Sequence, residues 1–111
     1  MAERGYLGEF ELMVMLALLR LGDDAYGVPI SKELAGTTGR EVTLGSVYAA
    51  LERLERKELV SSKLADPTPE RGGRAKRYFS VTRKGLQAVR ATKSALEDLW
   101  RKLPELRGQR A

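Results

Sequence analysis

The polar side chains of this sequence are better suited to binding than to catalysis. The 111 residues include no histidine and no cysteine, so the commonest general base and the thiolates that serve as nucleophiles and metal ligands are both absent. The remaining residues show neither a nucleophile paired with a base nor the spacing of a metal site. We therefore expect a protein that is not an enzyme and that uses no cofactor and no metal.

One uncharged stretch has the composition of a surface that contacts a large partner. Residues 43–51 carry no charge, whereas a solvated helix face usually carries Lys and Glu. Apolar residues at helical spacing predict that this helix, which runs to about residue 57, buries one face; they are Leu44, Val47, Leu51 and Leu54. We predict a DNA recognition helix whose contacts come from its first turns, at Thr43, Leu44, Gly45, Ser46 and Tyr48.

Each of these residues also has an ordinary structural explanation. Thr43 can cap the helix, Ser46 can be a solvated hydroxyl and Tyr48 a packed ring. Gly45 fits a close approach of the backbone to DNA, but it can also simply weaken the helix. Hydroxyl groups bind both base edges and phosphates and so carry little sequence information. We expect Tyr48 to bind a phosphate.

A basic cluster follows further along the chain. Four positive charges fall within seven residues without an acid among them, at Arg71, Arg74, Lys76 and Arg77. Phosphates are the natural partner of such a cluster. Because side chains alternate along a strand, Lys76 and Arg77 should point to opposite faces, and we expect only one of them to face DNA. Lys32 and Arg53 are weaker phosphate candidates, and Arg53 can instead pair with acids of its own helix.

The elements that must position these groups follow from periodicity. The pattern predicts helices over residues 9–21 and from residue 26 to about residue 34 or 35, ended by Gly36 and Gly39. Residues 59–65 and 76–82 are predicted strands around a turn-rich loop at residues 66–74. This order predicts a mainly α-helical winged helix-turn-helix with a small β-hairpin wing, occupying residues 1–82.

The last predicted helix, residues 83–103, has an apolar seam that its own short domain cannot cover. Its seam positions recur in steps of three and four with one polar interruption, at Leu86, Val89, Lys93, Leu96, Trp100 and Leu103. We therefore expect residues 83–111 to form a dimerisation helix and tail. The first helix is apolar nearly all round, which suits either a partner subunit or a central core position. The predicted dimer interface comprises Phe10, Met13, Ala17, Leu86, Val89, Leu96, Trp100 and Leu103.

Charge and hydropathy limit the alternatives. The net charge is +5, but residues 1–82 hold 12 basic and 12 acidic side chains, so the excess lies in residues 83–111. Bulk charge therefore does not establish DNA binding, and a winged-helix module that binds another protein is the alternative. The longest apolar run, residues 12–19, is far shorter than the ~20 residues of a membrane span. We expect a cytoplasmic protein that does not enter the membrane.

Two motifs in this chain resemble those of the PadR family of bacterial transcription regulators. They are residues 46–55, Ser-Val-Tyr-Ala-Ala-Leu-Glu-Arg-Leu-Glu, and residues 74–85, Arg-Ala-Lys-Arg-Tyr-Phe-Ser-Val-Thr-Arg-Lys-Gly; the pair Tyr26-Gly27 adds to the likeness. The chain is most similar to the short subgroup with a single C-terminal helix. It differs where Glu58 replaces the usual glycine and Ala49 the frequent proline.

The resemblance implies more than the residues alone predict. It implies a homodimer whose last helix packs on the first helix of the other subunit. It implies a palindromic double-stranded DNA operator, with the recognition helices in successive major grooves and the wings along the backbone. It also implies repression, in some members relieved by a small hydrophobic effector bound between aromatic residues. Trp100 and Leu96 are the candidates here, although a tryptophan at a heptad position is more often structural.

Overall fold

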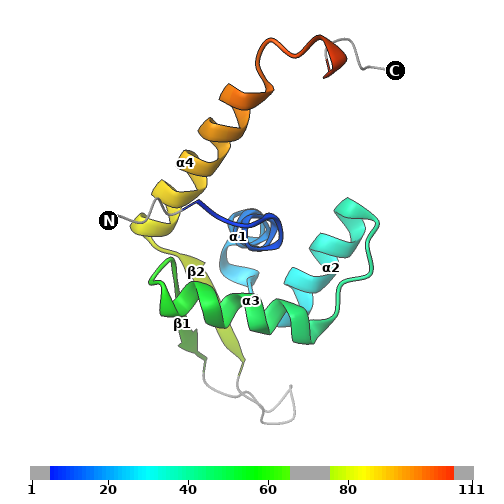
Figure 1. Ribbon diagram of the computed structural model, residues 1–111. Coiled ribbons are helices and arrows are strands. Elements are labelled where there is room, and N and C mark those ends of the chain that lie inside the picture. Colours follow the sequence, from blue (N-terminus) through cyan, green and yellow to red (C-terminus); the bar gives the residue numbers. More distant parts are fainter. Residues whose placement is uncertain (1–5, 66–75, 107–111) are drawn as a thin grey trace.

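Helices and one hairpin make up the described part of the computed structural model, which comprises residues 6–65 and 76–106 (Figure 1). These residues form four α-helices, two short 3-10 turns and a two-stranded antiparallel sheet. Their order is α1 (Glu9–Leu21), η1 (Gly22–Asp24), α2 (Gly27–Thr38), α3 (Leu44–Arg56), β1 (Val60–Leu64), β2 (Arg77–Val81), α4 (Arg83–Trp100) and η3 (Pro104–Leu106). The predicted fold class, a mainly helical protein with a hairpin wing, is confirmed.

α1 lies at the centre of the molecule, with α2, α3 and β2 packed around it (Figure 1). The largest fully buried side chains come from these helices; they are Val14, Met15, Ile30, Val47, Leu51 and Leu54. Leu44, which was predicted on the buried face of α3, is instead 41% exposed. Leu44 is the first residue of α3, and the buried face of the helix consists of Val47, Ala50, Leu51 and Leu54.

α2 is longer than its sequence pattern predicted. The helix continues through Gly36, because an interior glycine costs only about 1 kcal/mol and does not by itself stop a helix. It ends at Gly39, whose φ of 74° is left-handed and whose N–H donates to the Ala35 carbonyl. The Ser31 hydroxyl donates to the Val42 carbonyl at 3.0 Å and ties the following turn to α2. This turn sets the angle at which α3 leaves α2.

The hairpin pairs β1 with β2 from Val60↔Val81 to Leu64↔Arg77. On the other edge of β2, the Phe79 N–H donates to the Ala25 carbonyl at 2.8 Å. Phe79 is buried in the core. These contacts fix the base of the wing, which we define as the two strands and their loop, next to the start of α2. The loop predicted at residues 66–74 lies outside the described residues.

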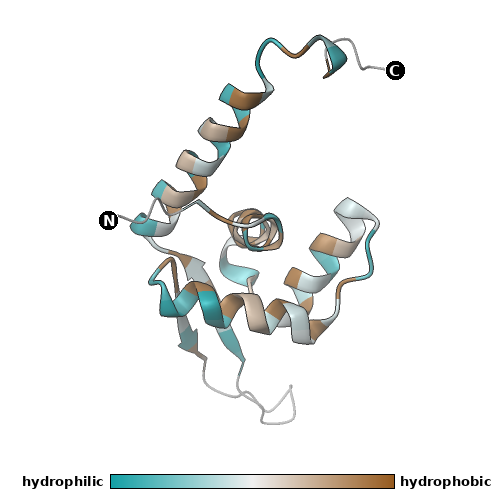
Figure 2. Cartoon of the chain, viewed as in Figure 1, coloured by the Kyte–Doolittle hydropathy of each residue, from teal (hydrophilic) through white to brown (hydrophobic). Residues whose placement is uncertain are grey.

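α4 leaves the core half-way along its length. Its N-terminal half packs on the core through Ala88 and Val89, and the buried Thr92 hydroxyl accepts a hydrogen bond from the Leu7 N–H at 3.0 Å. Beyond Thr92 the helix projects away from the body, and Figure 2 shows hydrophobic residues on this projecting part. The prediction that the helix reaches Leu103 is wrong. Lys102 turns left-handed with a φ of 63°, and Pro104 disfavours a helical conformation at the residue before it.

Candidate nucleic-acid interface

The first two turns of α3 are the exposed, uncharged surface that the sequence predicted. Thr43, Leu44, Gly45, Ser46 and Tyr48 are all exposed. Thr43 is the N-cap: its Oγ1 accepts from the Ser46 N–H at 3.1 Å, while the Ser46 hydroxyl donates to the Thr43 carbonyl at 2.8 Å. The ordinary capping explanation therefore holds for Thr43. Both oxygens remain on the surface with free lone pairs that a partner can use.

Tyr48 is both packed and exposed. Its phenol ring lies against Gly27, the buried first residue of α2, where an added Cβ would come within 2.6 Å of Tyr48 Cζ and closer still to the hydroxyl. The ring is nevertheless 42% exposed. Gly27 thus allows the tyrosine of α3 to lie across the start of α2 while part of its side chain stays exposed.

Gly45 has no comparable packing reason to be a glycine. A Cβ built on it meets no heavy atom of the described residues within 4 Å, in contrast to Gly27 and Gly85. Its φ is not left-handed either. Glycine weakens a helix relative to alanine, and neither packing nor backbone conformation within the described residues requires one here.

Lys76 and Arg77 have separate partners, in agreement with the predicted alternation. Lys76 Nζ lies 4.5 Å above the Tyr26 ring, which in turn meets Tyr78 edge-on at 5.2 Å. Arg77 Nη1 donates to the Ser62 hydroxyl at 3.0 Å. Ser62 in turn donates to Glu55 of α3 at 2.7 Å. Arg71 and Arg74, the other two members of the predicted basic cluster, lie outside the described residues.

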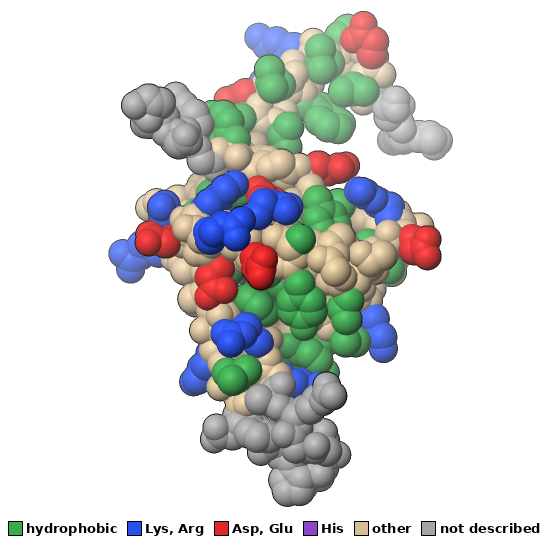
Figure 3. Space-filling view, turned by 60° about the horizontal axis from the view of Figure 1, so that its bottom comes forward, with side chains coloured by type: hydrophobic (Ala, Val, Ile, Leu, Met, Phe, Trp, Pro, Cys, Tyr) green, Lys and Arg blue, Asp and Glu red, His purple; other side chains and the backbone are tan. Residues whose placement is uncertain are grey.

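A groove joins α3 to the wing. Its volume is about 440 Å³, and its lining residues are Tyr48, Leu51, Glu52, Glu55, Arg77 and Phe79. Figure 3 brings this side of the molecule forward and shows acidic and hydrophobic side chains near its middle, with Lys and Arg groups around them. Tyr48 and Arg77, taken from the two separate sequence motifs, therefore border one groove.

The weaker phosphate candidates differ in their surroundings. Arg53 Nε donates to Glu11 of α1 at 3.1 Å, and Lys57 Nζ lies 3.5 Å from the same carboxylate. The alternative that Arg53 pairs with acids of its own helix is therefore wrong, because its side chain leaves α3 on the flank that faces α1. Lys32 is exposed on α2 and forms no ion pair within the described residues.

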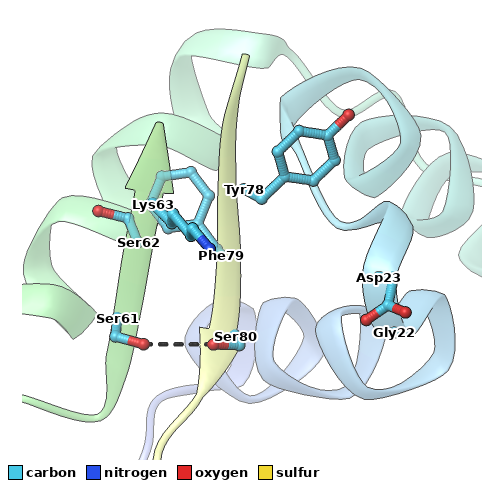
Figure 4. A pocket seen from close by; sticks show the side chains of 8 residues that line it. All are labelled: Gly22, Asp23, Ser61, Ser62, Lys63, Tyr78, Phe79 and Ser80. Carbon is cyan, nitrogen blue, oxygen red and sulfur yellow. Dashed lines mark hydrogen bonds between the residues drawn. The ribbon is translucent and has the colours of Figure 1, made fainter. Parts of the chain in front are cut away.

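The outer face of the hairpin carries a second hollow, of about 450 Å³, beside η1 (Figure 4). Its hydroxyls Ser61 and Ser80 form a hydrogen bond across the strands at 3.2 Å, and Tyr78 points toward the helical side of β2. In the described ranges no three acidic side chains come together in a way that could hold a metal ion. The polar groups that line this hollow are hydroxyls, the Lys63 amine and the Asp23 carboxylate.

The predicted dimer surface is only partly available. Ala17 is 1% and Val89 8% exposed, because both are buried in the core of their own chain. Ala17 is therefore wrongly assigned to an interface, since a buried side chain cannot meet a partner. Phe10, Met13 and Leu86 are half-buried. Of the predicted residues, Leu96, Trp100 and Leu103 are exposed. Three leucines that were not predicted, Leu16, Leu19 and Leu99, are exposed as well.

Comparison with known proteins identifies the family. The sequence pattern of the Transcriptional regulator PadR-like family matches residues 15–91, which is more than half of the chain. The chain belongs to the PadR-like family. The resemblance found in the sequence is thereby confirmed. The description of the family is that of transcription regulators, not enzymes, and the winged helix-turn-helix is the architecture expected of such a protein.

Solved structures agree with this fold. A PadR-like transcription factor from Bacteroides fragilis is 24% identical over 81% of this chain and 82% of its own, with a TM-score of 0.68. A PadR family regulator from Eggerthella lenta is 28% identical over 79% and 74%, with a TM-score of 0.65. A PadR-like regulator from Bacillus cereus is 22% identical over 82% and 84%, with a TM-score of 0.67.

Two further comparisons concern sequence relatives and membranes. A search of curated proteins found none that matches this chain. None of the helices among the described residues is long and apolar enough to cross a lipid bilayer.

Proposed function

We propose that this transcription regulator acts by binding double-stranded DNA in a sequence-specific way, with α3 in the major groove and the wing along the backbone. The observation that carries the proposal is the exposed, uncharged start of α3 around Gly45, which nothing within the described part of the chain explains. A major groove accommodates one α-helix, and base edges are read there. A surface without charge repulsion and without bulky side chains fits that task.

The contacts of the proposed complex fall into two groups. Thr43, Leu44, Gly45 and Ser46 face the bases or the adjoining sugar, and the Tyr48 hydroxyl donates to a phosphate. Arg77 contacts the backbone from the groove beside α3, and we assign Arg71 and Arg74 the same role. Lys32 and the half-exposed guanidinium of Arg53 contribute at most one phosphate each. Lys76 lies on the Tyr26 ring, so we favour Arg77 over Lys76 as the contact to the DNA backbone.

A gel-shift titration at fixed salt tests the assignment, with DNA selected by the protein from a genomic library. Tyr48→Phe keeps the ring on Gly27 and removes only the hydroxyl, whereas Tyr48→Ala removes both. We expect about tenfold weaker binding for Tyr48→Phe, because hydrogen bonds to charged groups contribute about 1.5–3 kcal/mol. Unchanged affinity in both variants would refute the contact. If the library yields no DNA at all, the protein-interaction module becomes the better explanation.

We further propose a homodimer on a palindromic operator. The projecting half of α4 exposes Leu96 and Trp100 at 47% and 61%, and two exposed leucines of α1, Leu16 and Leu19, are available as partners. Sedimentation at micromolar concentration should show a dimer. Leu96→Glu should shift it to monomer, whereas Ser94→Glu, on the opposite face of α4, should not. A monomeric wild-type protein would overturn the architecture.

The proposed function includes repression and a small hydrophobic effector. A groove of about 310 Å³ lies between α1 and α4, and its lining is apolar except for the ion pair between Lys93 and Glu97. Leu96 and Trp100 line it together with Leu12 and Leu16. Trp100 is the only tryptophan, so quenching of its fluorescence by planar apolar compounds reports binding directly. An effector should also release the protein from its operator in the gel shift; quenching without release would contradict a regulatory role.

A further inference from the structure

The outermost stripe of α3 differs from the flank that carries Tyr48. Helical spacing places Gly45, Ala49, Glu52 and Arg56 on one face, directly opposite the buried Val47, Ala50, Leu51 and Leu54. A helix that enters a groove presents this stripe to the floor of the groove. The first two stripe residues have little or no side chain, so the helix axis can approach closely, and Glu52 is the first side chain with a reach of several ångströms.

Glu52 is an uncommitted acid of this surface. Within residues 6–65 and 76–106 its carboxylate forms no hydrogen bond and no ion pair. The neighbouring acids are committed: Glu55 accepts from Ser62 at 2.7 Å, and Glu11 binds Arg53 at 3.1 Å. Glu52 also lines the groove that Tyr48 and Arg77 border. Its carboxylate is therefore exposed and free to accept hydrogen bonds at the centre of the proposed interface.

A carboxylate at this place has few partners on DNA. It is repelled by phosphates, and among base edges it can accept only from an amino group. In the major groove guanine shows the acceptors N7 and O6 and thymine the acceptor O4, whereas cytosine presents its N4 amine. Adenine also has an amine, but its adjacent N7 acceptor repels a second acceptor group. Arg56, which lies one helical turn further along the same stripe, offsets the repulsion between the carboxylate and the backbone.

We propose that Glu52 reads a base, selecting a cytosine in each half-site through its N4 amine. The proposal rests on the DNA-binding function above and adds the sequence information that the hydroxyls of Thr43 and Ser46 cannot supply. Glu52 selects as much by exclusion as by attraction, because guanine and thymine at the same position would face the carboxylate with acceptor atoms.

Selection of bound DNA from a random library tests this directly. The library is presented to the wild type, Glu52→Ala, Glu52→Gln and the control Asp98→Asn, which removes one negative charge from an exposed ion pair on α4. We expect one position of each wild-type half-site to be cytosine, preferred about tenfold or more over thymine. Glu52→Ala should remove the base preference at that position alone, and Glu52→Gln should shift the preferred base there toward adenine. Asp98→Asn should leave every position unchanged.

A titration then separates base reading from a general effect on structure or charge. The selected operator is compared with the same duplex carrying thymine in place of that cytosine. The wild type should prefer cytosine by about tenfold, and Glu52→Ala should bind both duplexes within about twofold of each other. If Glu52→Ala keeps the wild-type preference at every position, Glu52 does not read a base although DNA binding stands. If the wild type selects no sequence, the DNA-binding function itself fails, and this inference with it.

Discussion

The ring of Tyr48 on α3 lies against the buried Gly27 at the start of α2, at a distance where even a methyl group would collide with it. The two residues are far apart in the sequence and belong to the two helices of the helix-turn-helix. Their contact explains why a glycine is needed at the first position of α2, where its conformational freedom is not used. It also means that the surface offered by Tyr48 depends on α2.

Replacing Gly27 by alanine should therefore weaken DNA binding without a direct DNA contact being removed. The added Cβ would push the half-exposed Tyr48 ring from its place, at a cost of about 1 kcal/mol in the free energy of unfolding. A double-mutant cycle measures the coupling. In a Tyr48→Ala background, Gly27→Ala should cost nothing in stability and nothing further in affinity. Equal losses in both backgrounds would show that Gly27 acts independently of the ring.

The Gly45→Ala variant should be more stable and bind DNA less well. The added methyl group meets no atom of the described residues, and alanine favours the helix by about 0.5–1 kcal/mol. At the proposed interface the same methyl would hold α3 away from the DNA. Gly36→Ala is the matched control, because Gly36 is also helical and also has open space around its Cβ position. Gly36→Ala should raise the melting temperature as much as Gly45→Ala does and leave the DNA affinity unchanged. Equal DNA affinities of the two variants would argue against a close approach of DNA at Gly45.

Replacing Arg77 and replacing Lys76 should have different effects on the salt dependence of DNA binding. We expect Arg77→Gln to lower the slope of log affinity against log salt concentration by about 1, as for the loss of one phosphate contact. Lys76→Gln should leave that slope nearly unchanged and reduce stability slightly, since it removes a cation from the face of the Tyr26 ring. A lower slope for Lys76→Gln together with an unchanged slope for Arg77→Gln would place the DNA on the outer face of the hairpin.

Substituting glycine for Glu58 should stabilise the fold. Glu58 has a φ of 66° at the end of α3, and the N–H groups of Glu58 and Leu59 donate to the carbonyls of Glu55 and Leu54 at 2.9 Å in the manner of a Schellman cap. A left-handed non-glycine residue costs about 1–2 kcal/mol, so the gain in the free energy of unfolding should be about 1 kcal/mol. Thermal or urea unfolding measures it. Unchanged DNA affinity serves as the control, because the ion pair lost with Lys84 is long and exposed.

The sequence determined the elements and their order. Caps and hydrophobic periodicity are local properties, so the start of α3 at the Thr43 cap, the bounds of α1 and the hairpin pairing could all be predicted. At Glu58, where the family usually has glycine, the structure was needed to show that the residue is left-handed. Local signals failed in two places. Gly36 and Gly39 could both end α2, and Leu103 continued the apolar heptad of α4 beyond the end of the helix.

Only the tertiary structure decided which side chains share a surface. Glu11, 42 residues earlier in the chain, proved to be the partner of Arg53 because packing brings α1 against one flank of α3. Burial of Ala17 and Val89 depends likewise on which neighbours cover an apolar face, and apolar periodicity alone cannot distinguish the chain's own core from a partner. The exposed start of α3 therefore has two origins: the sequence supplies its uncharged residues, and the contact between Gly27 and Tyr48 gives it its shape.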